Sequence, residues 1–164
     1  MNNIKSVAII LARGGSKEIP NKNLESINNK SLLEITINQI KQAVNMDIFV
    51  SSDAENILDL ASNLNCFTIK RPDSLSGDES LSEDAILHAI NFIEKNSNIE
   101  FNTILFPQLT SPLRNNKNFK EAFELYKNEN YDSLFSSNDA RDYLLWSKDQ
   151  TGKLIEVNFK NKER

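Results

Sequence analysis

Three fixed positive charges, Arg13, Lys17 and Lys22, lie within ten residues of an otherwise acidic chain. The dipeptide Gly14-Gly15 between the first two would let the backbone approach a ligand closely and point N–H groups at it. An arginine can grip phosphate oxygens with two parallel hydrogen bonds, whereas a lysine acts as a compact point charge. Together these residue types predict a loop that binds a polyphosphate, and a triphosphate is its natural ligand.

The cationic loop, residues 11–24, differs from two widespread phosphate-binding loops. It has neither the Gly-x-x-x-x-Gly-Lys-Ser/Thr spacing of a P-loop nor the Gly-x-Gly-x-x-Gly fingerprint of a dinucleotide-binding site. Ser16 adds a hydroxyl donor to the cations, and Pro20 stiffens the turn. From these residues alone, a solvated basic loop that needs glycine to turn is the alternative interpretation.

Short apolar strands that alternate with amphipathic helices must position this loop. Strands are predicted over residues 4–12, 47–51, 66–69, 101–106 and 131–136. Helices are predicted from a capping box at 31–34 to residue 44, over 52–64, from a second capping box at 80–83 to about residue 95, and over 119–128. A hairpin that turns at Thr151-Gly152 is expected within residues 144–157.

This order of elements predicts an α/β fold with a mainly parallel sheet. Ligands of such sheets bind beyond the carboxyl ends of the strands. The candidate site loops are therefore residues 13–23, 51–53, 71–82 and 107–114.

Composition limits the classes of protein to be considered. The chain has 164 residues, the size of one ordinary domain, and a formal net charge of −4. An acidic balance argues against a general nucleic-acid or membrane-surface binder, which relies on accumulated lysine and arginine. Cys66 is the single cysteine, so no internal disulfide can form. With no apolar stretch of the roughly 20 residues that span a bilayer, we expect a soluble, cytoplasmic protein.

The cationic loop closely resembles the motif Arg-x-x-Ser-Lys-x-Ile/Leu-Pro-x-Lys-Asn of the acylneuraminate cytidylyltransferases, or CMP-sialic acid synthetases. Three further segments resemble the same family in the same order: residues 50–53, the Arg-Pro-x-x-Leu-x-x-Asp loop at 71–78, and Gln-Leu-Thr-Ser-Pro-Leu-Arg at 108–114. The resemblance covers about residues 7–114. It implies a three-layer α/β/α, Rossmann-like fold of the nucleotide-diphospho-sugar transferase type.

The resemblance also implies an activity: transfer of CMP from CTP to an acidic nonulosonic sugar of the N-acylneuraminate type, with release of pyrophosphate. Mg²⁺ is the implied cofactor and a homodimer the implied assembly. The catalytic charges would be Arg13, Lys17 and Lys22. The implied nucleotide-binding residues are Leu11, Ala12, Arg13, Ser16, Lys17, Lys22, Asn23, Arg71, Ser80 and Ser82. The implied sugar-binding residues are Gln108, Thr110 and Ser111.

The sequence departs from the family in several places. Glu18 stands where the family usually has glycine, and Leu109 replaces a proline. We expect residues 1–164 to be a single nucleotidyltransferase domain that is incomplete at its C-terminus, because the family's acidic Asp-x-Asp pair, which binds metal, is missing. The metal ligands are therefore open, with Asp53 and Asp78 as supporting carboxylates.

Two other functions compete with the enzyme. One is a catalytically inactive relic or fragment that binds nucleotide, which the missing acids favour. The other is an unrelated flavodoxin-like or Rossmann-like binding domain, which the absent glycine fingerprint disfavours. Several polar residues also have structural interpretations: helix capping for Asp53, Ser80 and Ser82, and packing for His88.

Overall fold

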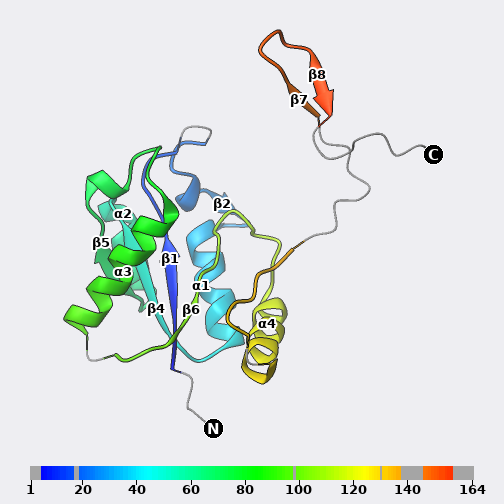
Figure 1. Ribbon diagram of the computed structural model, residues 1–164. Coiled ribbons are helices and arrows are strands. Elements are labelled where there is room, and N and C mark those ends of the chain that lie inside the picture. Colours follow the sequence, from blue (N-terminus) through cyan, green and yellow to red (C-terminus); the bar gives the residue numbers. More distant parts are fainter. Residues whose placement is uncertain (1–4, 17–18, 98, 130, 138–145, 157–164) are drawn as a thin grey trace. The chain divides into compact units, whose positions relative to one another are not determined.

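The computed structural model describes residues 5–16, 19–97, 99–129, 131–137 and 146–156 (Figure 1). The chain divides into two compact units, Met1–Tyr131 and Asp132–Arg164. In the part of the chain that is described, no helix combines the length and apolar character needed to cross a bilayer.

Four parallel strands form the central sheet of the first unit, in the order β5-β4-β1-β6. Their bounds are β1 Ser6–Leu11, β4 Asp47–Ser52, β5 Phe67–Lys70 and β6 Thr103–Leu105. Strand β1 is apolar on both faces: Ala8 and Ile10 belong to one hydrophobic cluster, Val7 and Ile9 to another. This arrangement confirms the predicted strand with two covered faces.

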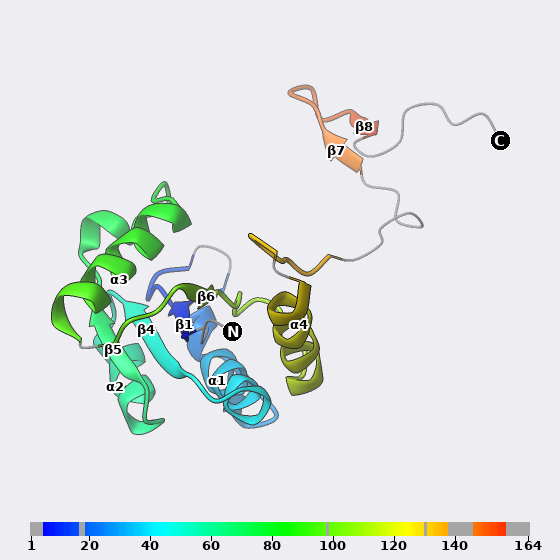
Figure 2. The ribbon, with the colours of Figure 1, turned by 60° about the horizontal axis from the view of Figure 1, so that its bottom comes forward.

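Helices cover both faces of the sheet, so the fold has three layers, α/β/α (Figure 2). Helices α1 (Leu32–Ala43), α2 (Glu55–Asn63) and α4 (Asn116–Glu129) pack their apolar residues into the cluster of Ala8 and Ile10. Helix α3 (Ser82–Asn96) packs Ala89 and Ile93 against the other face. The predicted three-layer, Rossmann-like fold with a mainly parallel sheet is confirmed.

The topology brings the candidate loops to one edge. Because all four strands are parallel, the loops that follow them leave from the same end of the sheet. From β1 the chain first builds outward through β4 to β5, and then returns to place β6 on the other side of β1. This reversal between β1 and β6 creates the crevice in which open α/β sheets bind ligands.

Small elements complete the first unit. They are the 3-10 turns η1 (Lys22–Leu24) and η2 (Asp73–Leu75), and the short strands β2 (Ser26–Ile27) and β3 (Lys30–Ser31). Strands β2 and β3 pair in an antiparallel hairpin. Asn28 and Asn29 form its turn with φ of 51° and 63°, a left-handed conformation that asparagine tolerates better than most residues.

Of the two capping boxes that the sequence predicts, the structure contains one. The Ser31 side chain accepts a hydrogen bond from the Glu34 N–H at 3.1 Å, which confirms the first cap. The second capping box is wrong: α3 begins at Ser82 without a side-chain cap, and the Ser80 hydroxyl instead donates to the Ser74 carbonyl at 3.3 Å. The competing local bond to a turn carbonyl explains the difference.

The predicted fifth strand, residues 131–136, is also wrong. Residues 131–137 form no strand and are all exposed, and the Phe135 side chain is 84% accessible. An alternating apolar pattern predicts a buried face, but a strand also needs a neighbouring strand for its backbone hydrogen bonds, which local sequence does not specify.

The second unit contains the predicted hairpin. Strands β7 (Trp146–Lys148) and β8 (Leu154–Glu156) are antiparallel, and residues 144–145 and 157 lie outside the described part of the chain. The Asp149 carboxylate accepts bonds from the Thr151 hydroxyl and N–H at 2.6 and 2.8 Å and from the Lys153 N–H at 3.0 Å. These hydrogen bonds lower the pKa of Asp149, and the bond from the Thr151 hydroxyl has the largest effect. Gly152, with φ of 83°, occupies the left-handed position of the turn.

Candidate functional site

The cationic loop starts as a continuation of β1. Leu11 is half-buried at the end of the strand, and Ala12 is fully buried with its N–H bonded to the Ser51 carbonyl at 3.0 Å. Only the backbone of Ala12 is therefore suited to meet a ligand. The residues that follow leave the sheet at its carboxyl edge, where the topology predicts the site.

The two glycines of the loop have different surroundings. A Cβ at Gly14 would lie 2.6 Å from the Cβ of Ala54, at the start of α2, whereas a Cβ at Gly15 would meet no atom within 4 Å. Neither glycine has a positive φ in the left-handed range. Gly14 is thus required for close packing, and Gly15 borders open space that a ligand could use.

We expect Gly14→Ala to lower the free energy of unfolding by about 1–3 kcal/mol, because the added methyl group overlaps Ala54. Gly15→Ala should change it by less than about 0.5 kcal/mol, because its methyl group projects into open space. Urea denaturation of both variants measures the difference. Equal stabilities would contradict the close contact at Gly14.

Arg13 reaches across to the loop that follows β5. Its guanidinium donates from Nη1 to the Gly77 carbonyl at 3.3 Å and to the Asp78 carboxylate at 3.0 Å. The Arg13 side chain is 37% exposed and that of Asp78 is 42% exposed, so solvent reaches the pair. Asn23 donates its side-chain amide to the Arg13 carbonyl at 2.9 Å. The structure therefore brings the side chain of Asn23 into contact with the backbone of Arg13.

The other loop residues are placed as follows. Ser16 is half-buried, and Lys17 and Glu18 lie outside the described residues. Lys22 is half-buried at the start of η1, where its N–H bonds to the Ile19 carbonyl at 3.1 Å. Asn21, with φ of 53°, turns the chain just before it.

Arg71 is buried directly after β5, with 4% of its surface exposed. Its Nη2 lies 3.6 Å from the Asp53 carboxylate, and its Nε donates to the Ser76 hydroxyl at 3.1 Å. Burial lowers the pKa of Arg71, and the charge of Asp53 partly opposes that shift. The Arg71 side chain exposes too little surface to bind a ligand. Its contacts with Asp53 and Ser76 instead stabilise the loop after β5.

Asp53 does not cap α2, and that interpretation is wrong. The N-cap is Ala54, whose N–H bonds to the Ser52 hydroxyl at 3.0 Å. The Asp53 carboxylate instead accepts the Gly14 N–H at 2.9 Å. A sequence that places Asp53 before a helix cannot reveal this bond, because Gly14 lies 39 residues away in the chain.

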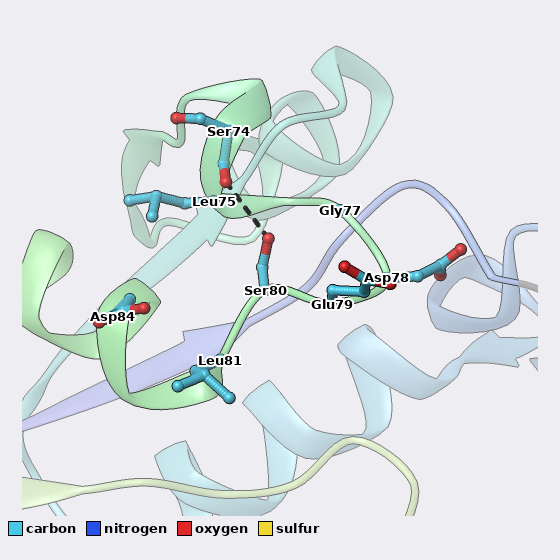
Figure 3. Close-up of a pocket in the computed structure, with 8 residues that line it drawn as sticks. All are labelled: Ser74, Leu75, Gly77, Asp78, Glu79, Ser80, Leu81 and Asp84. Atoms are coloured by element: carbon cyan, nitrogen blue, oxygen red, sulfur yellow. Dashed lines mark hydrogen bonds between the residues drawn. The ribbon is translucent and has the colours of Figure 1, made fainter.

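An open pocket of about 620 Å³ lies between η2 and the start of α3 (Figure 3). Its lining combines two leucines with serines, a glycine and acids: Ser74, Leu75, Gly77, Asp78, Glu79, Ser80, Leu81 and Asp84. Asp78 also holds Arg13, so the pocket adjoins the cationic loop. Ser80 lines it, whereas Ser82 is exposed in the first turn of α3 and does not.

The loop after β6 carries the implied sugar-binding residues. Gln108, Thr110 and Ser111 are exposed, while Leu109 between them is only 4% exposed and packs into the cluster under α1 and α4. Leu109, which replaces the family's proline, therefore anchors the loop by burial.

Two polar side chains that the sequence interpretation missed also hold this loop. The guanidinium of Arg114 donates to the Gln108 carbonyl at 3.0 Å and lies 4.5 Å from the centre of the Phe119 ring. Burial lowers the pKa of Arg114. Gln39 of α1 donates its amide to the carbonyls of Pro112 and Arg114. Nothing in the local sequence marks Gln39, because its partners are 73 and 75 residues away.

A metal site is not formed by the described residues. They contain no group of three or more histidine, cysteine, aspartate or glutamate side chains that could hold an ion. Asp53 faces Arg71, and Asp78 faces Arg13. Both carboxylates thus balance arginines, which suits ion pairing better than metal binding.

Solved structures share this fold. A CMP:2-keto-3-deoxy-manno-octonic acid synthetase complexed with CTP superposes with a TM-score of 0.62 at 17% identity, over 77% of this chain and 48% of that chain. A cytidylyltransferase from Leptospira borgpetersenii serovar Hardjo-bovis superposes with a TM-score of 0.56 at 19% identity, over 76% and 50% of the two chains. This chain therefore shares its α/β architecture with these structures.

The sequence identifies the family more narrowly. The family described as Cytidylyltransferase matches residues 7–157. The chain belongs to the cytidylyltransferase family.

Named relatives lie within the same family. The N-acylneuraminate cytidylyltransferase of Streptococcus agalactiae serotype V is 31% identical over 143 residues, which are 85% of this chain and 33% of that protein. The pseudaminic acid cytidylyltransferase of Campylobacter jejuni serotype O:23/36 is 28% identical over 168 aligned positions, covering 98% and 72%. The chain spans about a third of the length of the Streptococcus relatives that it matches.

Proposed function

We propose that the protein is a cytidylyltransferase that transfers CMP from CTP to an acidic nonulosonic sugar and releases pyrophosphate. The names of the relatives, N-acylneuraminate and pseudaminic acid cytidylyltransferases, support the class of acceptor. The observation that carries the proposal is the position of Arg13 and Asn23, which lie in contact at the carboxyl edge of the parallel sheet. Beside them β1 and β6 form the topological switch point.

The chemistry needs no nucleophile from the protein. A hydroxyl of the sugar would attack the α-phosphorus of CTP and lose its proton to solvent. The bond from the α-phosphorus to the oxygen that bridges it to the β-phosphate would break, and pyrophosphate would leave with the electron pair of that bond. Such a reaction depends mainly on positioning and on neutralising the phosphate charges. We assign that neutralisation to Arg13, Lys17 and Lys22, which can oppose the growing charge on the leaving pyrophosphate.

The remaining implied residues divide between the two substrates. The loop after β5, with Ser80 and Ser82 beyond it, would face the nucleoside, and buried Arg71 would keep that loop in place. The exposed side chains of the loop after β6 would face the acceptor sugar. This division follows the order of the loops along the edge of the sheet.

Mg²⁺ is included in the proposal as a cation that assists phosphate chemistry. The described residues alone supply no ligand set for it. The requirement for Mg²⁺ is measured by assaying the protein with and without a chelator.

Release of pyrophosphate tests the proposed activity. The protein would be incubated with CTP, Mg²⁺ and a panel of nonulosonic acids, with ATP, GTP and UTP as matched controls. We expect pyrophosphate only with CTP and an acceptor acid. Release with no acid of the panel would refute the transfer. CTP binding without turnover in calorimetry would then favour the alternative, a nucleotide-binding protein without catalysis.

Asp78→Asn should tighten the binding of CTP by about two- to fivefold, because the Asp78 carboxylate competes with phosphate for Arg13 and an exposed ion pair is weak. Glu79→Gln is the control, since it removes the same charge from the same pocket without touching the partner of Arg13. Calorimetric titration measures both affinities. An equal gain in the two variants would show a general charge effect and contradict the competition.

Two further parts of the proposal concern the whole protein. The single cysteine favours a cytoplasmic location, since no disulfide can form within the chain. A homodimer is proposed from the family resemblance, and light scattering after size-exclusion chromatography measures it.

A further inference from the structure

We infer that Asp53 is a positioning residue for the nucleotide site, acting through the backbone on which Arg13 stands; this inference rests on the proposed function. Asp53 follows β4 directly, and its side chain is only 22% exposed. It lies between the loop after β1 and the loop after β5, which are the two loops that the Arg13 side chain connects.

The first contact fixes the loop after β1. The Asp53 carboxylate accepts the Gly14 N–H at 2.9 Å, through Oδ1. A hydrogen bond from a backbone amide to a carboxylate is short and strong for its kind. Because Gly14 is the residue next to Arg13, this bond sets the position from which the arginine side chain departs.

The second contact fixes the loop after β5. The same Oδ1 lies 3.6 Å from the guanidinium of Arg71, whose side chain is 5% exposed. Arg71 in turn bonds to the Ser76 hydroxyl at 3.1 Å, and the Ser76 hydroxyl donates to the Pro72 carbonyl at 3.1 Å. These bonds fix residues 71–76. The next residue is Gly77, whose carbonyl accepts a hydrogen bond from Arg13.

Asp53 thus stabilises both the backbone from which the Arg13 side chain departs and the loop that its guanidinium contacts. One oxygen binds the backbone at the base of the arginine, and through Arg71 it steadies the segment that the guanidinium reaches. Displacement of a charged group by about 1 Å can lower a rate about 100-fold. A carboxylate that touches no reacting atom can therefore control the reaction through Arg13.

Four variants separate positioning from general stability. Asp53→Ala removes both contacts. Asp53→Asn keeps an oxygen that can accept the Gly14 N–H but loses the charge that faces Arg71. Glu55→Gln is the matched control: it removes the same charge two residues away, where Glu55 pairs with the exposed Lys70 at 3.1 Å. Asp53→Ala combined with Arg13→Ala completes a double-mutant cycle.

We expect Asp53→Ala to weaken CTP binding and to lower kcat/KM by at least about tenfold, with Asp53→Asn recovering most of that loss. Glu55→Gln should have the same CTP affinity and the same kcat/KM as the parent protein. In the Arg13→Ala background the same Asp53 substitution should have less than about a threefold effect, because Asp53 acts through that arginine. Calorimetry, pyrophosphate release and circular dichroism for the folded fraction supply the readouts. Equal, additive effects in both backgrounds would overturn the inference.

Hydrogen exchange of the backbone amides at residues 13–16 tests the same inference without nucleotide. Asp53→Ala should accelerate their exchange by at least about tenfold, and Glu55→Gln should not. Unchanged exchange in Asp53→Ala would overturn the positioning role even if CTP binds.

Accelerated exchange in a protein that does not bind CTP would leave the loop contact standing and refute the proposed function instead. If Asp53→Ala does not fold, Asp53→Ser takes its place, because its shorter side chain cannot span both contacts. Faster exchange and weaker CTP binding in a fully folded Asp53→Ser variant support the positioning role, and parent-like exchange and affinity refute it.

Discussion

Arg13→Ala should lower kcat/KM for CTP by about 100- to 1000-fold and leave the fold intact. Removal of one donor from a site that stabilises developing negative charge has an effect of this size. The structure places the Arg13 side chain across the edge of the sheet, with Nη1 3.0 Å from Asp78 and 3.3 Å from the Gly77 carbonyl. Both contacts are solvent-accessible enough to be exchanged for phosphate oxygens.

The chain offers a matched control at the other end of the same strand. Lys5 precedes β1, lies at the opposite edge of the sheet, and pairs with Glu100 at 3.9 Å. Lys5→Ala removes one positive charge and should leave kcat/KM within about twofold of the parent, because an exposed pair contributes little. Arg13→Lys should recover part of the loss, since lysine keeps the charge but not the paired hydrogen bonds. Parent-like kinetics in Arg13→Ala would remove the arginine from the mechanism.

Leu109→Ala should lower the free energy of unfolding by about 2–4 kcal/mol, the usual cost of a truncated leucine in a packed core. The Leu109 side chain is 4% exposed and packs in the cluster that also contains Ile37 and Phe119. Urea denaturation monitored by circular dichroism measures the loss, which exceeds that of any surface substitution proposed above.

Leu113 is the control for this prediction, because it lies in the same loop with 98% of its surface exposed. Leu113→Ala should change the free energy of unfolding by less than about 0.5 kcal/mol. Leu109→Ala should also raise KM for the acceptor sugar, since Gln108 and Thr110 flank the buried anchor. A stable Leu109→Ala variant would contradict the anchoring of the loop by burial.

The fold and the edge of the sheet at which the candidate loops meet could be predicted, because both depend on local patterns. Four of the five predicted strands exist, since short apolar runs such as Val7–Ile10 can be buried only between two layers. Once strands and helices alternate, the parallel sheet follows, and with it the single edge at which the loops meet. The prediction of a ligand loop after the first strand required no knowledge of any distant contact.

The predictions that the structure contradicts concern contacts between residues far apart in the chain. Asp53 was expected to cap a helix, yet its partners are Gly14 and Arg71, 39 and 18 positions away. Gly14 was interpreted as leaving room for a ligand, but it leaves room for Ala54. Residues 131–136 have the pattern of a strand without the neighbouring strand that a ladder requires. Tertiary contacts decide such cases, and one-dimensional patterns do not contain them.

The pairing of Arg13 with Asp78 changes what an arriving nucleotide displaces. A bare cationic loop is surrounded by dissolved anions, and binding releases them, so affinity falls steeply as ionic strength rises. Here a tethered carboxylate takes the place of one such counterion. Binding at Arg13 is then an exchange of one anion for another, and its dependence on salt should be shallower than the number of cations in the loop suggests.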